Sequence, residues 1–175
     1  MIFDFAIGVA PGFYKLDVSD LPCLIGSFAM GPIPGVLIQL IKILVKLLLK
    51  PTSTAFIGEL AAFIMSSVYC ACAGYIYKIN KNKKQAIKAI IIASIVQVII
   101  ACFANYIFII PAYSNLYGMP IEAIIAAGTK IFPIVTDKLS FVLCCVAPFN
   151  AIKVAIVDVL TLVLYKHISP LLKGF

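Results

Sequence analysis

The stretch AIIIASIVQVIIACFANYIFII, from Ala89 to Ile110, decides the fold class. It contains no charged residue, and it is long enough for a helix to cross the hydrocarbon core of a bilayer, which takes about 20 apolar residues. A lysine-rich segment precedes it and Pro111 follows it. Because proline disrupts a helix interior, we predict a membrane-spanning helix that ends at Pro111.

The composition of the whole chain agrees with a membrane protein. Of the 175 residues, 63% are hydrophobic and only 12% are charged. A soluble domain is usually about half apolar and about a quarter charged. This chain therefore has too few polar residues to cover a water-soluble globule, and its length predicts a single transmembrane domain over residues 1–175.

Further apolar stretches lie on both sides of this span. We expect a short helix at 20–30, a turn at Gly31–Gly35, and spans at 34–50, 54–77 and 149–166. Small residues at four-residue spacing favour close helix contacts, namely Ser27, Gly31 and Gly35, and Ser66, Cys70 and Gly74. The 112–140 segment is predicted to be a long connection with a short helix at 120–127. Pro148 and Asn150 are expected to open the last span.

The lysines indicate the orientation of the bundle. The net charge is +7 and all basic residues are Lys, so the bidentate Arg contacts typical of nucleic-acid readout are absent and no nucleic acid is expected. Lysines concentrate in the 78–88 loop and in the C-terminal tail, two spans apart. The positive-inside rule places both in the cytoplasm of a multi-pass cell-membrane protein. The 11–20 and 111–140 segments then face outward.

Polar side chains from four segments are predicted to meet near the outer surface. Ionisable groups inside a membrane are costly and usually face a cavity or a partner. We therefore expect an outward-facing polar pocket among apolar helices. The residues are Asp17, Asp20, Glu59, Asn105, Asn150 and Lys153.

Each of these side chains also has a structural explanation. Asn150 is at the start of the predicted last span and either caps it or binds a ligand. Instead of binding a ligand, Lys153 and Glu59 would form a structural ion pair with each other. Instead of lining a pocket, Asp17 and Asp20 would be loop charges in contact with water. Asp20 is also a candidate cap for the short helix at 20–30. Asn105 is harder to explain, because a buried amide needs several hydrogen-bond partners and its surroundings offer few.

Two further questions stay open. Tyr14 lies near the outer interface, where either an aromatic belt or a ligand accounts for it. Asp158 lies mid-span, and Lys42 and Lys46 are its candidate partners. If these two lysines do not pair with Asp158, they extend their ammonium groups to the membrane interface or form ion pairs with other residues.

Motifs for chemistry are missing from the sequence. There is no G-x-x-x-x-G-K-[ST] phosphate loop, no H-E-x-x-H and no G-x-S-x-G. The six cysteines form no C-x-x-C pair and His167 is the only histidine, so a metal site is not expected. We predict no catalytic residues, and the chain is not expected to be an enzyme.

Several segments, in order along nearly the whole chain, resemble a known family. That family is the riboflavin-specific substrate-binding subunits of energy-coupling factor (ECF) transporters. The matching segments are Phe13–Gly35 (FYKLDVSDLPCLIGSFAMGPIPG), Ile57–Ala61 (IGELA), Ala104–Tyr106 (ANY) leading to Pro111, Pro148–Lys153 (PFNAIK) and Leu164–Pro170 (LYKHISP).

The resemblance implies a six-helix membrane subunit that binds riboflavin from outside, under its first loop. It also implies a membrane-embedded coupling (T) subunit and two cytoplasmic ATPase subunits as partners, and no cofactor besides the transported riboflavin. By position, Asn105, Asn150 and Lys153 would hold the flavin. The resemblance implies a supporting set of Glu59, Leu16, Asp17 and Asp20, to which we add Tyr14.

The N-terminus departs from this pattern. The family's first helix is a full span, whereas Met1–Ala10 would be about 15 Å long as a helix, half of the hydrocarbon core. The predicted fold class is therefore an all-α polytopic membrane protein, a compact helical bundle of five spans plus the remnant of a sixth. An upstream apolar helix is expected in an extended reading frame.

Three rival functions remain at this point. The chain could be the substrate-binding subunit for another vitamin, with the same fold and partners. It could be a membrane enzyme acting on lipid, although the nucleophile–base set that such chemistry needs is missing. It could be a non-transport bundle protein, in which case the polar groups would pair only with each other.

Overall fold

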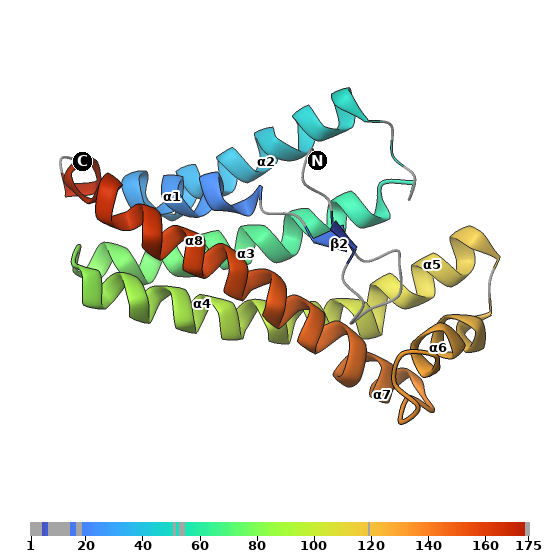
Figure 1. Ribbon diagram of the computed structural model, residues 1–175. Helices are drawn as coiled ribbons and strands as arrows, with labels where there is room; N and C mark the ends of the chain where they lie inside the picture. Colours follow the sequence, from blue (N-terminus) through green and yellow to red (C-terminus); the bar gives the residue numbers. More distant parts are fainter. Residues whose placement is uncertain are drawn as a thin grey trace.

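The computed structural model describes residues 5–6, 15–16, 19–50, 52, 55–118 and 120–173, with side chains for 19–50, 52, 55–118 and 120–165. Within these residues, four helical stretches are long and apolar enough to cross a membrane: Pro32–Leu49, Ile57–Ile79, Lys83–Tyr117 and Lys138–Tyr165. They lie roughly lengthwise beside one another (Figure 1). The prediction of an all-α membrane bundle is confirmed.

The first two helices form a tight hairpin. α1 (Asp20–Met30) and α2 (Pro32–Leu49) are joined by Gly31, whose φ of +100° is a conformation that residues with a Cβ rarely adopt. Pro32 then fits the first turn of α2, where its missing N–H costs nothing. The chain turns here as predicted, but at Gly31 alone, because α2 begins at Pro32 and includes the rest of the Gly31–Gly35 segment expected to be a turn.

Small residues let this hairpin pack closely on α3 (Ile57–Ile79), as their spacing predicted. A Cβ built on Gly35 would lie 2.6 Å from the Ser27 Cβ, and one on Gly74 would lie 2.2 Å from the Ser27 Oγ. The Ser27 hydroxyl donates to the backbone oxygen of Cys70. α1, α2 and α3 therefore meet at a contact where side chains would not fit.

The two longest helical stretches do not end where their prolines predicted. α4 (Lys83–Ala104) continues through a π-helical turn, η1 (Asn105–Ile109), into α5 (Ile110–Tyr117). The last stretch begins earlier than 149, with α7 (Lys138–Phe141), η2 (Val142–Val146) and α8 (Ala147–Lys173). The predicted connection over 112–140 is helical to Tyr117, and the short helix expected at 120–127 is confirmed as α6 (Ile121–Thr129).

The π-helical turns explain these two errors. Each is followed, after one residue, by proline: Pro111 after η1 and Pro148 after η2. In each turn a backbone N–H bonds to the carbonyl five residues earlier, from Ile110 to Asn105 and from Ala147 to Val142. A π-helical turn contains one residue more than an α-helical turn, and this shifts the pattern of backbone hydrogen bonds just before the proline. Proline itself has no N–H to donate. The helix can therefore pass through the proline.

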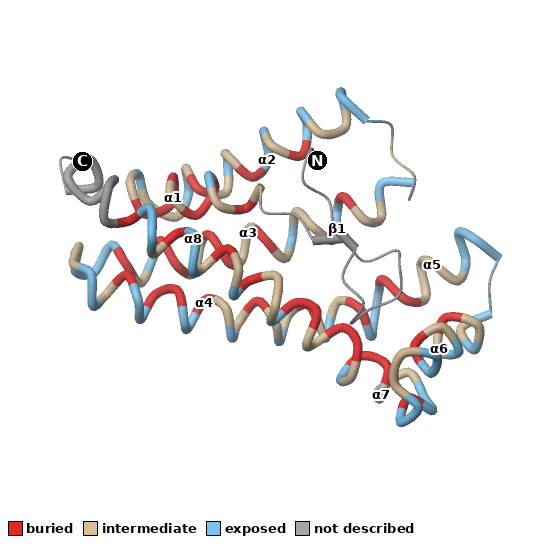
Figure 2. The backbone as a smooth tube through the Cα atoms, viewed as in Figure 1, coloured by how far each residue is buried: buried red, intermediate tan, exposed pale blue. Residues whose placement is uncertain are grey.

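Buried residues concentrate where α1, α3, α4 and α8 face one another (Figure 2). One apolar cluster joins these four helices, with Phe28, Tyr69, Tyr77 and Val157 among its members. A second cluster packs α5, α6 and η2 together around Phe141. We call the end with Gly31 and residues 78–88 the lysine end, and the end with residues 105–147 the distal end.

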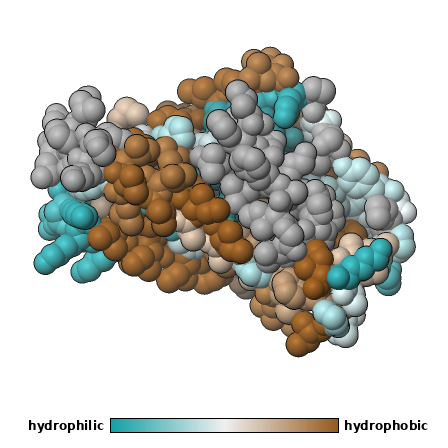
Figure 3. All heavy atoms as spheres, viewed as in Figure 1, coloured by the Kyte–Doolittle hydropathy of each residue, from teal (hydrophilic) through white to brown (hydrophobic). Residues whose placement is uncertain are grey.

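The lateral surface is apolar, as a lipid-facing surface should be. Large hydrophobic side chains are exposed on every long helix, including Leu48 at 86%, Ile79 at 72% and Ile107 at 67%. In Figure 3 hydrophobic residues form a continuous brown area on the left half of the visible face, beside the hydrophilic residues of the lysine end. Together with the four membrane-length helices, this identifies the chain as a membrane protein.

Near the N-terminus the structure describes a short antiparallel pair, β1 (Phe5–Ala6) with β2 (Lys15–Leu16). Phe5 faces Leu16 and Ala6 faces Lys15 in the register. The expected helix remnant at Met1–Ala10 otherwise lies outside the described residues. Within it, Phe5–Ala6 is extended instead of helical, because these two residues form backbone hydrogen bonds to β2.

Candidate ligand-binding site

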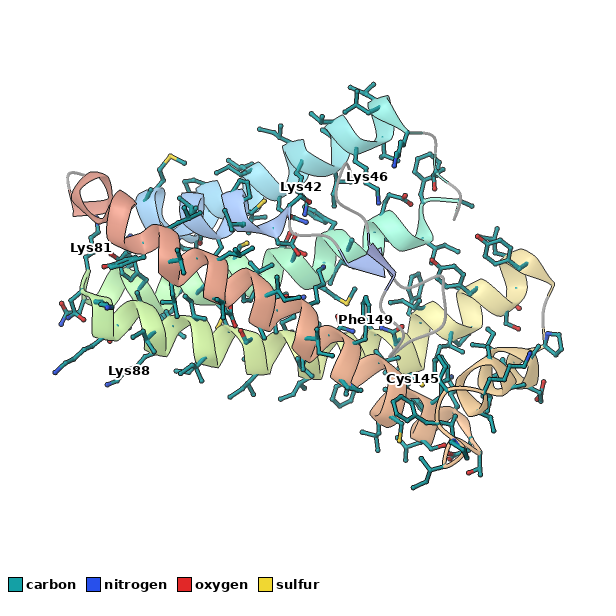
Figure 4. All side chains as sticks on the ribbon, viewed as in Figure 1. Lys42, Lys46, Lys81, Lys88, Cys145 and Phe149 are labelled. Carbon is teal, nitrogen blue, oxygen red and sulfur yellow. The ribbon has the colours of Figure 1, made fainter. Side chains whose placement is uncertain are left out.

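Asp20 is the centre of a buried charge cluster. It is the first residue of α1 and only 3% exposed. Its carboxylate forms ion pairs with Lys42 of α2 and with Lys153 of α8, the latter at 3.0 Å. Figure 4 labels Lys42 and Lys46 on α2, beside this part of the bundle. The start of α1 is therefore tied by charge to two membrane-length helices.

Asp20 is neither a helix cap nor a solvated loop charge. Ser19 occupies the cap position of α1, without a side-chain capping hydrogen bond. Lys42 and Lys153 supply two positive charges to one carboxylate, which offsets the cost of taking it out of water. Of the two alternatives for Lys42, pairing is the one that the structure bears out.

A second ion pair lies nearer the distal end. Glu59, in the first turn of α3, is 3.7 Å from the Lys46 ammonium and accepts a hydrogen bond from the Thr52 hydroxyl at 3.0 Å. The structure thus pairs Glu59 with Lys46, and Lys153 with Asp20, in place of the predicted Glu59–Lys153 pair. The side chain of Lys46 is 32% exposed, so water screens this contact more than the one at Asp20.

The two asparagines each lie in or near a π-helical turn. Asn105 opens η1, and Asn150 follows η2 and Pro148. Both are buried, at 1% and 4% exposure. Each side-chain amide donates to the carbonyl four residues earlier, Asn105 to Ala101 at 2.8 Å and Asn150 to Val146 at 2.9 Å. π-helical turns of this kind are frequent at functional sites.

Asn150 is not the cap of the last span, contrary to one of its predicted roles. The helical stretch begins at Lys138, where Asp137 and Ser140 form a capping box. Asn150 therefore lies well inside the helix, and the N-terminus of this helical stretch is not at Asn150 or Lys153. Pro148 misled the prediction because η2 carries the helix past it.

Asp158 has partners other than the predicted lysines. Its carboxylate accepts hydrogen bonds from the Tyr69 hydroxyl of α3 and from the Ser94 hydroxyl of α4, the second at 2.6 Å. Lys42 is paired with Asp20 instead, and Lys46 with Glu59. Asp158 thus links three helices through hydroxyl groups.

The polar groups do not all lie at one depth. At a rise of 1.5 Å per residue, Lys42 is about 15 Å along α2 from the lysine end, and Lys46 is about 6 Å further. The cluster at Asp20 is therefore deeper than the one at Glu59. The error came from placing Asp20 in a surface loop, whereas its helix begins partway into the bundle.

Three predicted site residues carry no described side chain. Tyr14 and Asp17 lie outside the described residues, and Leu16 is described only as backbone in β2. Lys42 is a further residue of the cluster that the prediction did not include in the site. The sequence signal for including Lys42 was its spacing, because it lies one helical turn from Lys46 and therefore on the same face of the helix.

A cavity of about 560 Å³ lies elsewhere, between the end of α2 and the start of α3. Its lining is mostly apolar: Leu44, Leu47, Leu48, Phe56 and the single polar residue Thr52. Neither the asparagines nor Lys153 line this cavity. We therefore do not assign the predicted ligand to it.

The sequence pattern of a family described as the substrate-specific component of ECF transporters matches residues 1–165. The match covers all the charged and amide residues discussed above. This chain belongs to that family. The four membrane-length helices, with the shorter α1, agree with membership of this substrate-specific component family.

Individual relatives support the same assignment. The chain is 30% identical to the riboflavin transporter RibU of Staphylococcus aureus (strain TCH60), over 97% of this chain and 82% of that protein. It is 22% identical to the riboflavin transporter FmnP of Bacillus subtilis (strain 168), over 97% and 84%. A solved structure of the S component of a bacterial ECF transporter matches with a TM-score of 0.71 and 30% identity, over 97% of this chain and 86% of that one.

Proposed function

We propose that this substrate-specific component binds riboflavin and takes part in its uptake. The observation that carries the proposal is the full-length similarity, because relatives named as riboflavin transporters match 97% of the chain. The buried polar residues near the distal end support it. Ionisable and amide groups inside a membrane usually serve a ligand or a partner.

We place the ligand against Asn105, Asn150 and Lys153. Riboflavin is neutral and flat, with a uracil-like edge of N–H and C=O groups and a polyol tail. An asparagine amide has two N–H donors and an oxygen acceptor, and one donor of each amide is used within its own helix. An amide thus offers both a donor and an acceptor, which suits the N–H and C=O groups of the uracil-like edge. Lys153 can donate to ring carbonyls or to ribityl hydroxyls while Asp20 holds its ammonium in place.

The first loop would cover the ligand. Tyr14, Leu16 and Asp17 would belong to this loop, and Asp20, which opens α1 after it, fixes the start of α1 to α2 and α8. Glu59 would accept hydrogen bonds from ribityl hydroxyls. In this arrangement Lys42 is a positioning residue, since it acts on the ligand only through Asp20.

The coupling partners follow from the same proposal. The chain has no phosphate-binding loop, so ATP hydrolysis would come from two cytoplasmic ATPase subunits, linked to this chain by a membrane-embedded T subunit. The lysine end would face the cytoplasm, as the positive-inside rule requires. The distal end would then receive riboflavin from outside.

The visible absorption spectrum of the purified, detergent-solubilised protein tests the vitamin. We expect a flavin spectrum at near-stoichiometric amount, displaced by excess roseoflavin and unaffected by pantothenate. A colourless protein that takes up no added riboflavin would refute the proposal and leave the family assignment intact. Displacement by another vitamin would keep the transporter and change its substrate.

A matched pair of variants tests the site. Asn150→Ala should weaken riboflavin binding by about 0.5–1.5 kcal/mol for each hydrogen bond lost. Thr161→Val is the control, because Thr161 is also buried on α8 and also bonds to the carbonyl four residues earlier. Isothermal titration of both variants should separate them, and equal affinities would remove Asn150 from the site.

A further inference from the structure

A second cavity, of about 320 Å³, lies at the lysine end, where the α1–α2 turn meets the end of α3 and the α3–α4 loop. Two of its lining residues are Lys78 and Lys81. The others are small or apolar: Ser27, Phe28, Ala29, Met30, Gly31 and Gly74. Figure 4 labels Lys81 at this end of the bundle, and Figure 3 shows hydrophilic residues gathered there beside the apolar covering.

The backbone forms one wall of this cavity. A Cβ on Gly74 would lie 3.1 Å from the backbone nitrogen of Pro32, so α3 and the start of α2 approach each other without side chains between them. α1 and α3 end beside this cavity and α2 begins beside it. The full positive charges at the cavity are those of Lys78 and Lys81.

Among the residues whose side chains are described, none supplies a negative charge that pairs with these lysines. The sequence contains no Asp or Glu between Glu59 and Glu122, so α4 and both of its flanking loops carry none. On α8, Asp158 is engaged by Tyr69 and Ser94. Lys78 is exposed and Lys81 half-buried, and neither forms an ion pair with any residue that the structure describes.

Apolar side chains flank the cavity and face outward. Met30 is 55% exposed, Ile33 73%, Tyr75 68% and Ile79 72%. The cavity thus lies where the lipid-facing surface gives way to the lysine loop, which is the level of phospholipid headgroups. Juxtamembrane lysines attract anionic lipids by about fivefold in affinity for each lysine near the surface.

We propose that this cavity binds the headgroup of an anionic phospholipid, with its phosphate between Lys78 and Lys81 and its acyl chains along Met30, Ile33 and Ile79. The site is separate from the flavin site, because Asp20 and Lys153 meet Lys42 about 15 Å along α2 from the lysine end. The lipid phosphate brings a negative charge to Lys78 and Lys81, which form no ion pair with any described residue. The bound lipid anchors the α1–α2 turn and the α3–α4 loop together.

A charge-matched pair of double variants tests the site in nanodiscs. Lys78→Ala/Lys81→Ala removes two charges that line the cavity, and Lys83→Ala/Lys84→Ala removes two exposed charges from the nearby first turn of α4 that do not line it. Labelled phosphatidylglycerol in discs of phosphatidylcholine is the probe. We expect the first variant to lose about 25-fold in affinity and the second about twofold or less. Equal losses would mean diffuse attraction to the whole loop and would overturn the proposal.

A third variant keeps the charges and fills the space. Ala29→Leu places a larger side chain in the cavity lining, and it should also displace phosphatidylglycerol while riboflavin binding, used as a test of folding, stays unchanged. If soluble glycerol phosphate binds the wild type as tightly as the lipid does, the site is one for free phosphate and the proposal fails. If the Lys78→Ala/Lys81→Ala variant keeps its lipid but loses a coupling subunit, the surface is a protein interface instead.

Discussion

Two groups of lysines in this protein have opposite surroundings. Lys42, Lys46 and Lys153 lie within the membrane-length helices, and each has a carboxylate partner. The lysines of the 78–88 loop are at the lysine end, and no described residue forms an ion pair with Lys78 or Lys81. The positive charges inside the bundle are therefore neutralised by carboxylates of the same chain. Those of Lys78 and Lys81 are left to be neutralised by molecules outside the described residues. The following substitutions test that difference.

Asp20→Asn should have the largest effect on stability. It leaves Lys42 and Lys153 close together without the carboxylate that both contact. Removing one partner of a buried ion pair costs about 3–5 kcal/mol. Thermal unfolding in detergent should show a large loss, and riboflavin affinity should fall too, because Lys153 is no longer held. Glu122→Gln makes the same charge change on an exposed side chain and should leave stability nearly unaltered.

Asp158→Leu should have the next largest effect. The substitution removes the acceptor shared by the Tyr69 and Ser94 hydroxyls, on two other helices. Interhelical hydrogen bonds in membrane proteins average about 0.6 kcal/mol each and reach about 1.7, so the loss should be about 1–3 kcal/mol. Asp158→Asn should cost less, since an amide oxygen still accepts one of the two bonds. Chemical unfolding curves in which the Asp158→Asn variant is less stable than the Asp158→Leu variant would contradict this assignment.

The apolar runs were sufficient to predict that the helices exist, but not where they end. The charge-free stretch from Ala89 to Ile110 could hardly be anything but a membrane helix. Pro111 and Pro148 were read as boundaries because a regular α-helix cannot supply a partner for every carbonyl around a proline. A π-helical turn ahead of each proline removes that conflict. Such a turn depends on packing, and no residue in the sequence marks it.

The members of the charge cluster were partly predictable, but the pairs were not. Asp20, Glu59 and Lys153 stand out as charges in or beside apolar stretches. Which carboxylate meets which lysine depends on how far α1 and α2 are displaced along their axes relative to α3 and α8. The close contact at Ser27 and Gly35 fixes that displacement for α1 and α2. A shift of one turn would exchange Lys42 for Lys46 beside Asp20.

Glu59→Gln sharpens the comparison, because Lys46 is intermediate between the two groups of lysines. Its ammonium lies 3.7 Å from the Glu59 carboxylate while its side chain is 32% exposed. Partly exposed pairs are worth about 0.2–1 kcal/mol, and a glutamine still accepts the hydrogen bond from Thr52. The loss of stability should therefore be below about 1 kcal/mol and should shrink in high salt. A loss as large as that of Asp20→Asn would mean that burial does not separate the two pairs.

Asp137→Asn should have the smallest effect, because it changes an exposed charge at the start of α7. The Asp137 carboxylate accepts from the Ser140 hydroxyl and, at 2.9 Å, from the Ser140 backbone N–H. The side-chain hydrogen bond, followed by the backbone one, lowers the pKa of Asp137 below its ordinary value. A lowered carboxyl pKa means that this cap is at full strength above the ordinary pKa of about 4 and weakens as the pH falls further. Hydrogen exchange of the 138–141 amides should show protection that declines with acid in the wild type and stays flat in Asp137→Asn. The same acid dependence in both proteins would assign it to another group.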